Sequence, residues 1–380
     1  MSKIIYLDNH ATTPVDPRVL KAMLPYLRER FGNAASRNHF FGFEASKAVE
    51  KARAQVAKLI NAEPREILFT SGATESNNLA LKGFAEANRG RGNHIVTAAT
   101  EHRSVLDSCK RLELAGFKVT YLPVKPDGFL DLRRLKEAVT PKTILISVML
   151  ANNEIGVLQP LVEIGRFARA KGILLHSDAA QALGKIPIDV KKMSIDLLSI
   201  TAHKIHGPKG IGALYLRKTG PQVKLLPILD GGGHEGGYRS GTLNLPGIVG
   251  FGEACRIYSE RNGLKKESLR LARLRDRLKD KLLKEIEGCR VNGSLEHRLP
   301  NNLNVSLDGI DAKALMAGLK ELALSSGSAC LSTSSEPSYV LKALGLSESL
   351  RRSSIRFGLG RFTTPAEVDR AASQVIRAVQ

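Results

Sequence analysis

The chain has 380 residues, of which 43% are hydrophobic and 25% are charged. This composition is typical of a soluble globular protein, and the length allows roughly two domains. The formal net charge is +20, but no nucleic-acid-binding motif accompanies it. We therefore assign the charge to solvated helix faces and expect no direct binding of nucleic acid, while an acidic protein partner stays open.

Targeting and membrane segments are not expected. The N-terminal residues lack the long apolar core and the small-residue cleavage site of a signal peptide. The longest strongly apolar stretch, residues 143–151, is far shorter than the roughly 20 residues that span a bilayer. We expect a cytoplasmic protein without a membrane partner.

Helix-like and strand-like segments alternate from residue 43 to about residue 217. Helices are predicted over residues 43–61 and 74–87 from their apolar periodicity. Strands are predicted over residues 67–70, 94–98, 118–124, 143–150, 172–177, 197–201 and 212–217. Such alternation indicates a mostly parallel sheet covered by helices.

The pattern changes after a basic amphipathic helix predicted over residues 264–287. Short strands over residues 302–307 and 354–357 mix with helices, and Thr364 opens the last helix with a capping box. This mixture indicates a smaller α+β domain. We divide the chain into two domains. The large domain comprises residues 14–262, and the small domain comprises residues 1–13 and 263–380.

Lys204 follows the apolar run at residues 197–200 and precedes a turn rich in glycine and proline. This places it at the carboxyl end of a sheet strand, where α/β proteins bind ligands. Two histidines, His203 and His206, lie close to it in sequence. A desolvated lysine near cationic groups can form a Schiff base with an aldehyde cofactor. Taken alone, Lys204 fits a surface lysine of a basic protein better than a catalytic one.

Asp178 ends the preceding strand-like run, and Gln181 follows three residues later. A carboxylate at this place can hold the protonated ring nitrogen of pyridoxal 5'-phosphate, and Gln181 can bond to the same ring. Asp178 alone could also be a helix cap. Asp178 followed by Lys204 on the next strand loop is the arrangement that a pyridoxal phosphate site needs.

Residues 71–76 follow a predicted strand and open a helix. The free backbone N–H groups of such a turn make an anion site, although an ordinary capped helix start explains them as well. Residues 231–236 match the G-x-G-x-x-G pattern but lack the preceding strand and following helix that dinucleotide binding requires. We interpret them as a loop.

The four cysteines differ in their surroundings. Cys109 and Cys255 lie in helix-like segments, which predicts small core residues, and Cys289 is ambiguous. Cys330 lies within residues 325–335, a stretch rich in serine that is typical of a loop, where a cysteine can be exposed and reactive. No pair has the Cys-x-x-Cys spacing, so we expect neither a metal site nor a disulfide framework.

Several longer motifs are specific. They are Phe69-Thr70-Ser71-Gly72-Ala73-Thr74-Glu75-Ser76, Asn152-Asn153-Glu154-Ile155-Gly156 and Ser325-Ser326-Gly327-Ser328-Ala329-Cys330. In these motifs the chain resembles the pyridoxal-phosphate-dependent cysteine desulfurases of the IscS/NifS type, which are class V aminotransferase-like. The resemblance extends from residues 6–14 to residues 358–363. The resemblance implies the type I pyridoxal-phosphate-dependent transferase fold, with a mostly parallel seven-stranded sheet and a small domain that carries the cysteine loop.

The resemblance also implies residue roles. Cys330, Lys204 and His102 would be catalytic. The cofactor would be bound by Lys204, Gly72, Ala73, Thr74, His102, Asn153, Asp178, Gln181, Thr201, His203 and Thr242, the last from the other subunit of a homodimer. Arg356 and Asn153 would hold the substrate carboxylate. From the residues alone, His102 fits a structural histidine and Arg356 a solvent-facing arginine.

The implied reaction converts L-cysteine to L-alanine. Lys204 removes the Cα proton, the Cys330 thiolate attacks the substrate sulfur, and a persulfide is left on Cys330. Its sulfur would supply iron–sulfur clusters or thiolated cofactors and tRNA, through a scaffold protein or a tRNA-thiolation carrier. The cysteine segment lacks the deletion of SufS-like members and predicts a mobile arm. The chain ends at Gln380, so we expect no scaffold docking through the tail that IscS-like relatives carry.

Alternatives on the same fold are a selenocysteine lyase and an aminotransferase, although an aminotransferase needs no thiol nucleophile such as Cys330. Alternatives of a different class are a non-catalytic sulfur carrier and a basic RNA-binding protein. The pairing of Asp178 with Lys204 argues against both.

Overall fold

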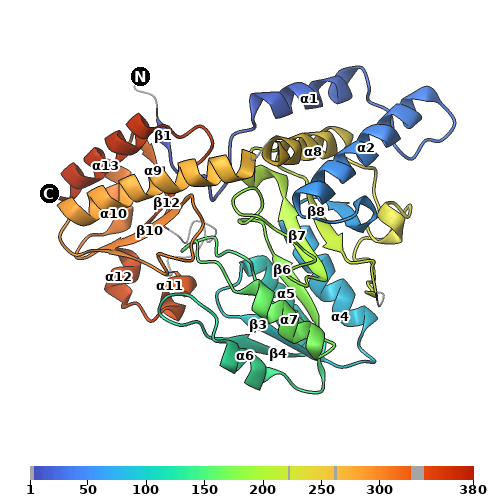
Figure 1. The fold of residues 1–380 in the computed structure, drawn as a ribbon, viewed down its shortest axis with the longest axis horizontal. Coiled ribbons are helices and arrows are strands. Elements are labelled where there is room, and N and C mark those ends of the chain that lie inside the picture. The colour runs from blue at the N-terminus through green and yellow to red at the C-terminus, as the bar shows by residue number, and fades with distance from the viewer. Residues whose placement is uncertain (1–3, 221–222, 261–262, 327–337) are drawn as a thin grey trace.

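The structure, a computed structural model, describes residues 4–220, 223–260, 263–326 and 338–380. A seven-stranded sheet lies at the centre of the larger part (Figure 1). In order across the sheet, its strands are β2 (Ile67–Thr70), β8 (Gly212–Leu216), β7 (Leu197–Thr201), β6 (Leu174–Asp178), β5 (Thr143–Ser147), β3 (His94–Ala98) and β4 (Lys118–Leu122). β8 runs antiparallel to both neighbours, and the other strands are parallel to one another. The predicted mostly parallel sheet is confirmed.

Helices cover both faces of this sheet, which explains why its strands are apolar on both sides. In β2, Phe69 packs into the core on one face and Leu68 into the core on the other, because successive side chains of a strand point to opposite faces. The first face carries α1 (Pro17–Arg28), α2 (Phe40–Leu59), α6 (Leu132–Ala138), α7 (Leu161–Ala170) and α8 (Leu245–Ser259). The second carries α5 (Arg103–Leu114) and one helical stretch made of α3 (Ala73–Asn78), the π-helical η2 (Leu79–Gly83) and α4 (Phe84–Ala87).

A smaller sheet lies to one side, together with both chain ends (Figure 1). It consists of β9 (Cys289–Val291), β10 (Asn302–Leu307) and β12 (Ser354–Gly358), antiparallel with β10 in the middle. Its core takes the leucine stripe of α9 (Gly263–Glu285) and the apolar face of α13 (Pro365–Val379). The remaining elements are β1 (Ile5–Tyr6), which pairs in parallel with β11 (Leu322–Ala323), the helices α10 (Ala312–Gly318), α11 (Tyr339–Ala343) and α12 (Glu348–Arg352), and the 3-10 turns η1 (Pro64–Glu66), η3 (Ala202–Lys204) and η4 (Glu235–Gly237).

The division into two domains stays a prediction. In its favour, the apolar cluster around the small sheet draws its buried members from residues 5–7 and 271–375. The N-terminal residues Ile5 and Leu7 therefore pack with the C-terminal part of the chain.

Several predicted boundaries move in the structure. α2 begins at Phe40 because the His39 side chain caps it by accepting a hydrogen bond from the Gly42 N–H. The helix predicted over residues 74–87 is interrupted by the π-helical η2. The strands predicted to reach residues 124 and 150 end at Leu122 and Ser147. The capping box at Thr364 is confirmed. Among the described residues, no helix is both long and apolar enough to cross a bilayer.

Candidate active site

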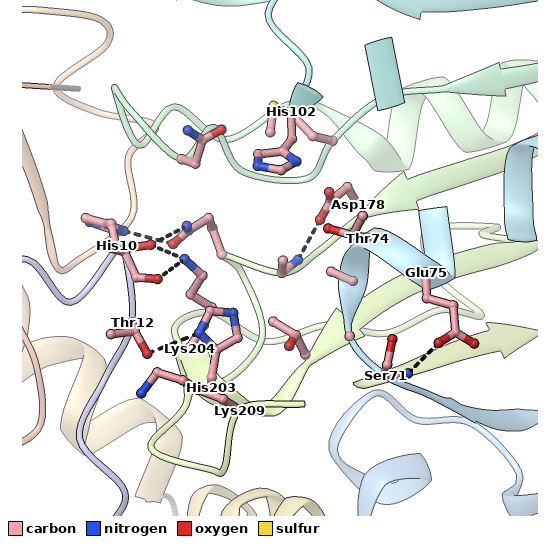
Figure 2. A pocket seen from close by; sticks show the side chains of 18 of the residues that line it. His10, Thr12, Ser71, Thr74, Glu75, His102, Asp178, His203, Lys204 and Lys209 are labelled. Atoms are coloured by element: carbon pink, nitrogen blue, oxygen red, sulfur yellow. Dashed lines mark hydrogen bonds between the residues drawn. The ribbon is translucent and has the colours of Figure 1, made fainter. Parts of the chain in front are cut away.

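A cavity of about 500 Å³ opens at the carboxyl ends of β6 and β7 (Figure 2). This is the edge of a parallel sheet at which α/β proteins bind ligands. Of the residues predicted for the site, the cavity is lined by Gly72, Ala73, Thr74, His102, Asn153, Asp178, Gln181, Thr201, His203, Lys204 and Arg356. The volume is sufficient for a small cofactor together with a substrate.

Lys204 lies in the 3-10 turn η3 that follows β7, and its side chain enters the cavity (Figure 2). Its Nζ donates hydrogen bonds to the backbone carbonyls of His10 and Ala11, the second at 2.7 Å. The alternative of a surface lysine is therefore wrong. The amine is held by the N-terminal segment of the chain at the centre of the site.

Asp178 is the last residue of β6, which pairs with β7. Its Oδ2 accepts a hydrogen bond from Asn77 Nδ2 at 2.7 Å, and its Oδ1 accepts one from the Ala180 N–H at 2.9 Å. The second contact resembles the capping role that the sequence left open. The first orients the carboxylate of Asp178, a residue that is 5% exposed, within a cavity that it shares with Lys204.

The turn before α3 has a backbone that only glycine adopts readily. Gly72 has φ 155° and ψ 177°, a region that other residues rarely occupy. Strand β8 packs closely against this turn, because a Cβ at its first residue, Gly212, would lie 2.7 Å from the Gly72 Cα. The first turn of a helix leaves backbone N–H groups without intrahelical partners, so this close-packed turn suits an anion such as a phosphate.

Glu75 stiffens the same turn. Its carboxylate accepts hydrogen bonds from the Ser71 N–H at 2.8 Å and from Arg239 Nε at 2.9 Å. Burial would raise the pKa of this carboxyl, but the hydrogen bonds from Arg239 and Ser71 outweigh it and lower the pKa below its ordinary value. Glu75 is thus ionised at neutral pH and tied to the segment that precedes Thr242.

Two histidines of the cavity are neutral. Burial, reinforced by Arg356, lowers the pKa of His10 to about 3, and burial, reinforced by Lys204, lowers that of His203 to about 4. His10 Nδ1 lies 2.9 Å from Gln181 Oε1, and Gln181 Nε2 donates to the His10 carbonyl at 3.0 Å. This reciprocal pair fixes the orientation of Gln181.

Arg356 is buried on β12, with 2% of its side chain exposed. Its Nη2 donates to Asp8 Oδ1 at 2.9 Å and its Nη1 to the Asn153 carbonyl at 2.9 Å. Among the described residues, neither Arg356 Nε nor Asn153 Oδ1 has a hydrogen-bond partner. The alternative of a solvent-facing arginine is wrong, and the spare polar atoms of both residues suit a bound polar ligand.

The aminotransferase class-V family profile matches residues 5–371. The chain is 58% identical to the cysteine desulfurase IscS of Anaeromyxobacter sp. (strain K), over 97% of this chain and 90% of that one. Among solved structures it is similar to a NifS-like protein (TM-score 0.91, 39% identity, 98% of both chains) and to SspA in complex with cysteine (TM-score 0.82, 38% identity, 94% of this chain and 99% of that one).

The chain belongs to the aminotransferase class-V family. Its members depend on pyridoxal phosphate, so the predicted class of enzyme, the cofactor and the fold class are confirmed at this level.

Two predicted site residues are not placed in the cavity. Thr242 is exposed and does not line the cavity, so its predicted role depends on a second subunit. Cys330 belongs to residues 327–337, outside the described residues.

Two described residues on either side of Cys330 in the sequence, Ser325 and Tyr339, bond to residues of the site or next to it. The Ser325 carbonyl accepts a hydrogen bond from the backbone N–H of Arg356 at 2.7 Å. On the other side, Tyr339 Oη donates to the Glu101 carbonyl at 2.6 Å, next to His102.

The other cysteines are in structural positions. Cys109 and Cys255 are fully buried, and burial raises the pKa of the Cys109 thiol to about 12 and that of Cys255 further. Burial also raises the pKa of Cys289, on β9, to about 11. None of these thiols is ionised at neutral pH. Among the described residues, no cluster of three or more histidine, cysteine or acidic side chains could hold a metal.

Sequence reasoning assigned no role to several lining residues, namely His10, Ala11, Thr12, Ser71, Glu75, Met149, Ala180, Lys209 and Gly210. His10 and Thr12 come from the N-terminal segment, and Ser71 and Glu75 from the turn before α3. Both segments belong to stretches that carried the family resemblance, so the resemblance could have indicated these residues. Neither the periodicity of the sequence nor the spacing of its residues could have done so.

Proposed function

We propose that this protein is a pyridoxal-phosphate-dependent cysteine desulfurase that converts L-cysteine to L-alanine and takes the sulfur onto Cys330. The observation that carries the proposal is the placement of Lys204, Asp178 and Arg356 around one cavity, in a chain 58% identical to a cysteine desulfurase IscS. Incubation of the purified protein with L-cysteine, followed by assay of both alanine and enzyme-bound persulfide, tests it. Alanine without a persulfide would contradict the role of Cys330.

The residues of the cavity fit pyridoxal phosphate. Lys204 would hold the cofactor aldehyde, Asp178 its pyridinium nitrogen, and the turn at Gly72 its phosphate, with Thr74, Thr201 and His203 nearby. The bound cofactor supplies an electron sink for the charge that develops at the substrate Cα. Asp178 suits this role because its carboxylate is buried and oriented by Asn77.

The substrate carboxylate would be held by Arg356 and Asn153. A guanidinium binds a carboxylate through parallel N–H groups, and Arg356 Nε is a buried donor without a partner among the described residues. SspA, whose solved structure is a complex with cysteine, shares this fold.

The proton and sulfur steps would fall to different residues. Lys204 takes the Cα proton, while His102 presents its ring at the opposite wall (Figure 2). The Cys330 thiolate attacks the substrate sulfur, the carbon–sulfur bond breaks, and the bonding electrons remain with the carbon skeleton, which is protonated to L-alanine. Ser325 and Tyr339, which precede and follow Cys330 in the sequence, support this, because Ser325 bonds to Arg356 of the cavity and Tyr339 to the residue before His102.

The active form would be a homodimer in the cytoplasm, with Thr242 reaching the phosphate of the partner's site. Seven large apolar residues are exposed on α1 and around the start of α2, namely Leu20, Leu24, Leu27, Phe31, Phe40, Phe41 and Phe43. Phe31 and Phe41 stack on each other with ring centroids 5.4 Å apart. A patch of this kind marks an interface, and a second copy of the chain would cover it.

The sulfur acceptor would be a protein, either an iron–sulfur scaffold or a carrier for tRNA thiolation. Selenocysteine lyase activity remains the alternative reaction for the same site, since selenium would occupy the place of the substrate sulfur. Comparing the rates of alanine formation from L-cysteine and L-selenocysteine distinguishes the two.

A further inference from the structure

A chain of hydrogen bonds links Asp178 to His102 through Asn77 and Ser104. Asn77 Nδ2 donates to Asp178 Oδ2 at 2.7 Å and to Ser104 Oγ at 2.8 Å. Ser104 Oγ lies 2.8 Å from His102 Nδ1, and the Ser104 backbone N–H donates to the same nitrogen at 3.2 Å. Asn77 is fully buried, so the chain of bonds runs inside the protein between two residues of the cavity.

The direction of each bond follows from the carboxylate. Because a carboxylate only accepts, the Asn77 amide must turn its NH₂ group toward Asp178. The second hydrogen of that NH₂ group points at Ser104 Oγ, which accepts it and directs its own O–H at His102 Nδ1. Two donors, the hydroxyl and the backbone N–H of Ser104, then converge on Nδ1, so this nitrogen carries no proton.

The helix that follows His102 also favours a neutral imidazole. His102 is the N-cap of α5, which begins at Arg103. The N-terminus of a helix carries a partial positive charge that opposes a cation at this place. A protonated imidazolium would also set an N–H at Nδ1 against the N–H of Ser104.

We propose that Asn77 and Ser104 are positioning residues that hold His102 as a neutral imidazole with its proton on Nε2. The catalytic meaning of this inference rests on the proposed function, but its geometry does not. In this state His102 offers an N–H donor at Nε2 and is not a base, so the Cα proton goes to Lys204. His102 then contributes by stacking and by a hydrogen bond.

The tautomer is measured from two-bond ¹⁵N–¹H couplings of the histidine rings, in holoprotein labelled with ¹⁵N-histidine. The chain has nine histidines, and the His102→Gln variant identifies the signals of His102 by their loss. We expect an unprotonated Nδ1 and a protonated Nε2 at pH 7.5. A protonated Nδ1, in either the other tautomer or the imidazolium, would overturn the proposal even if desulfurase activity is present. If His102 shows the expected tautomer but the protein has no desulfurase activity, the result refutes only the proposed function.

Ser104 variants test the positioning role. Ser104→Ala removes the hydroxyl, so a second tautomer should appear and kcat should fall about 10-fold, with the KM for L-cysteine and the cofactor absorbance unchanged. Ser104→Thr keeps the hydroxyl and should behave as wild type. Ser108→Ala is the matched control, since the Ser108 hydroxyl donates only to the Ser104 carbonyl, at 2.7 Å. If a folded Ser104→Ala protein shows wild-type His102 signals and a wild-type kcat, the positioning role of Ser104 is excluded. If that variant does not fold, the spectrum of the wild-type protein still decides the tautomer.

Discussion

Backbone groups position Lys204 at both ends of its side chain. The turn η3 fixes its Cα directly after β7, and the carbonyls of His10 and Ala11 accept hydrogen bonds from its Nζ. A further lysine lies behind it: Lys185 is buried, donates to the Lys204 carbonyl at 3.2 Å, and has its pKa lowered to about 8 by burial. Two lysines thus meet at one turn, and of these two Lys204 lines the cavity whereas Lys185 does not.

Lys204→Ala should abolish turnover while leaving part of the cofactor affinity. The variant loses both the covalent link and the group that takes the Cα proton, so alanine formation should fall by roughly 1000-fold or more. Asp178 and the turn at Gly72 remain, so equilibrium dialysis should still detect bound pyridoxal phosphate. Borohydride reduction of the wild-type protein, followed by peptide mapping, supplies the control. A reduced adduct on Lys185 rather than Lys204 would refute the assignment.

Cys330→Ser should stop sulfur transfer without disturbing the cofactor site. A hydroxyl is a far weaker nucleophile than a thiolate at neutral pH, so neither alanine nor persulfide should accumulate. The matched control replaces Cys109, Cys255 and Cys289 together by alanine, and most of the turnover should survive because these thiols are buried or half-buried away from the cavity. Alanine formation near the wild-type rate in Cys330→Ser would replace the persulfide mechanism with one that needs no enzyme thiol.

At the level of elements, the close contact between β8 and the turn before α3 positions the part of the turn that lines the cavity. A Cβ at Gly212 would meet the Ile200 carbonyl at 2.5 Å and the Gly72 Cα at 2.7 Å. The two glycines therefore allow an edge of the sheet and the start of a helix to approach more closely than side chains permit.

Gly212→Ala should weaken pyridoxal phosphate binding by pushing the turn at Gly72 away from the sheet. We expect roughly a 10-fold rise in the cofactor Kd or more, since displacing backbone by several tenths of an ångström costs about 1–3 kcal/mol. Fluorescence titration of the apoprotein with the cofactor measures it. Gly90→Ala is the control, because a Cβ there meets nothing within 4 Å. Equal Kd values for the two variants would contradict the role given to this contact.

Among the strands buried on both faces, the sequence pattern predicted the bounds of some but not of others, since β5 ends at Ser147 instead of residue 150. The strands β2, β3 and β7 begin and end where they were expected, because their runs of apolar residues are bounded by polar ones. The π-helical η2 was not predictable, since its apolar residues fit an α-helix equally well. Pairings such as β1 with β11 depend on contacts between distant parts of the chain and leave no local pattern.

For the site, local signals identified Lys204 and Asp178, while the family resemblance was needed for His102, Asn153 and the substrate role of Arg356. Arg356 shows the reason. Its neighbours on β12 gave an alternation that predicts an exposed side chain, whereas the side chain is buried and bonds to Asp8, 348 residues away.

At the level of the whole molecule, the exposed apolar patch on α1 and α2 predicts that assembly and activity are linked. Phe31→Asp places a charge in this patch and should shift light scattering from dimer toward monomer, with loss of activity as the shared site is lost. Leu114→Asp is the control, because Leu114 is 81% exposed on α5, outside the patch. A fully active monomer would exclude the composite site.

Mixing two inactive variants tests the same arrangement from the other side. If Thr242 serves the partner's cofactor, one subunit carrying Lys204→Ala and another carrying Thr242→Ala form a dimer in which one site has both residues intact. Activity should therefore reappear after subunit exchange in an equimolar mixture, to about a quarter of the wild-type value, because half of the dimers are mixed and each has one intact site. Continued inactivity of a mixture shown to contain mixed dimers would contradict the role of Thr242.

Buried neutral histidines make the fold sensitive to acid. Burial lowers the pKa of His176 to about 3, below its value in the unfolded chain. The unfolded state therefore binds more protons between about pH 6.5 and pH 3, so this contribution to stability is complete above pH 6.5 and is lost as the pH falls. From pH 7 to pH 5 the loss should be about 2 kcal/mol. Urea unfolding of wild type and His176→Gln at both pH values measures it, and equal pH dependence of the two would refute it.

The ion pair between Asp8 and Arg356 also bears on the order of events during synthesis. Asp8 is synthesised 348 residues before Arg356, yet the two side chains form a direct ion pair at 2.9 Å. The Nζ of Lys204 likewise needs carbonyls from the first residues of the chain. A nascent chain therefore has no complete pocket before Arg356 has been synthesised, so pyridoxal phosphate cannot be captured in its final setting until then.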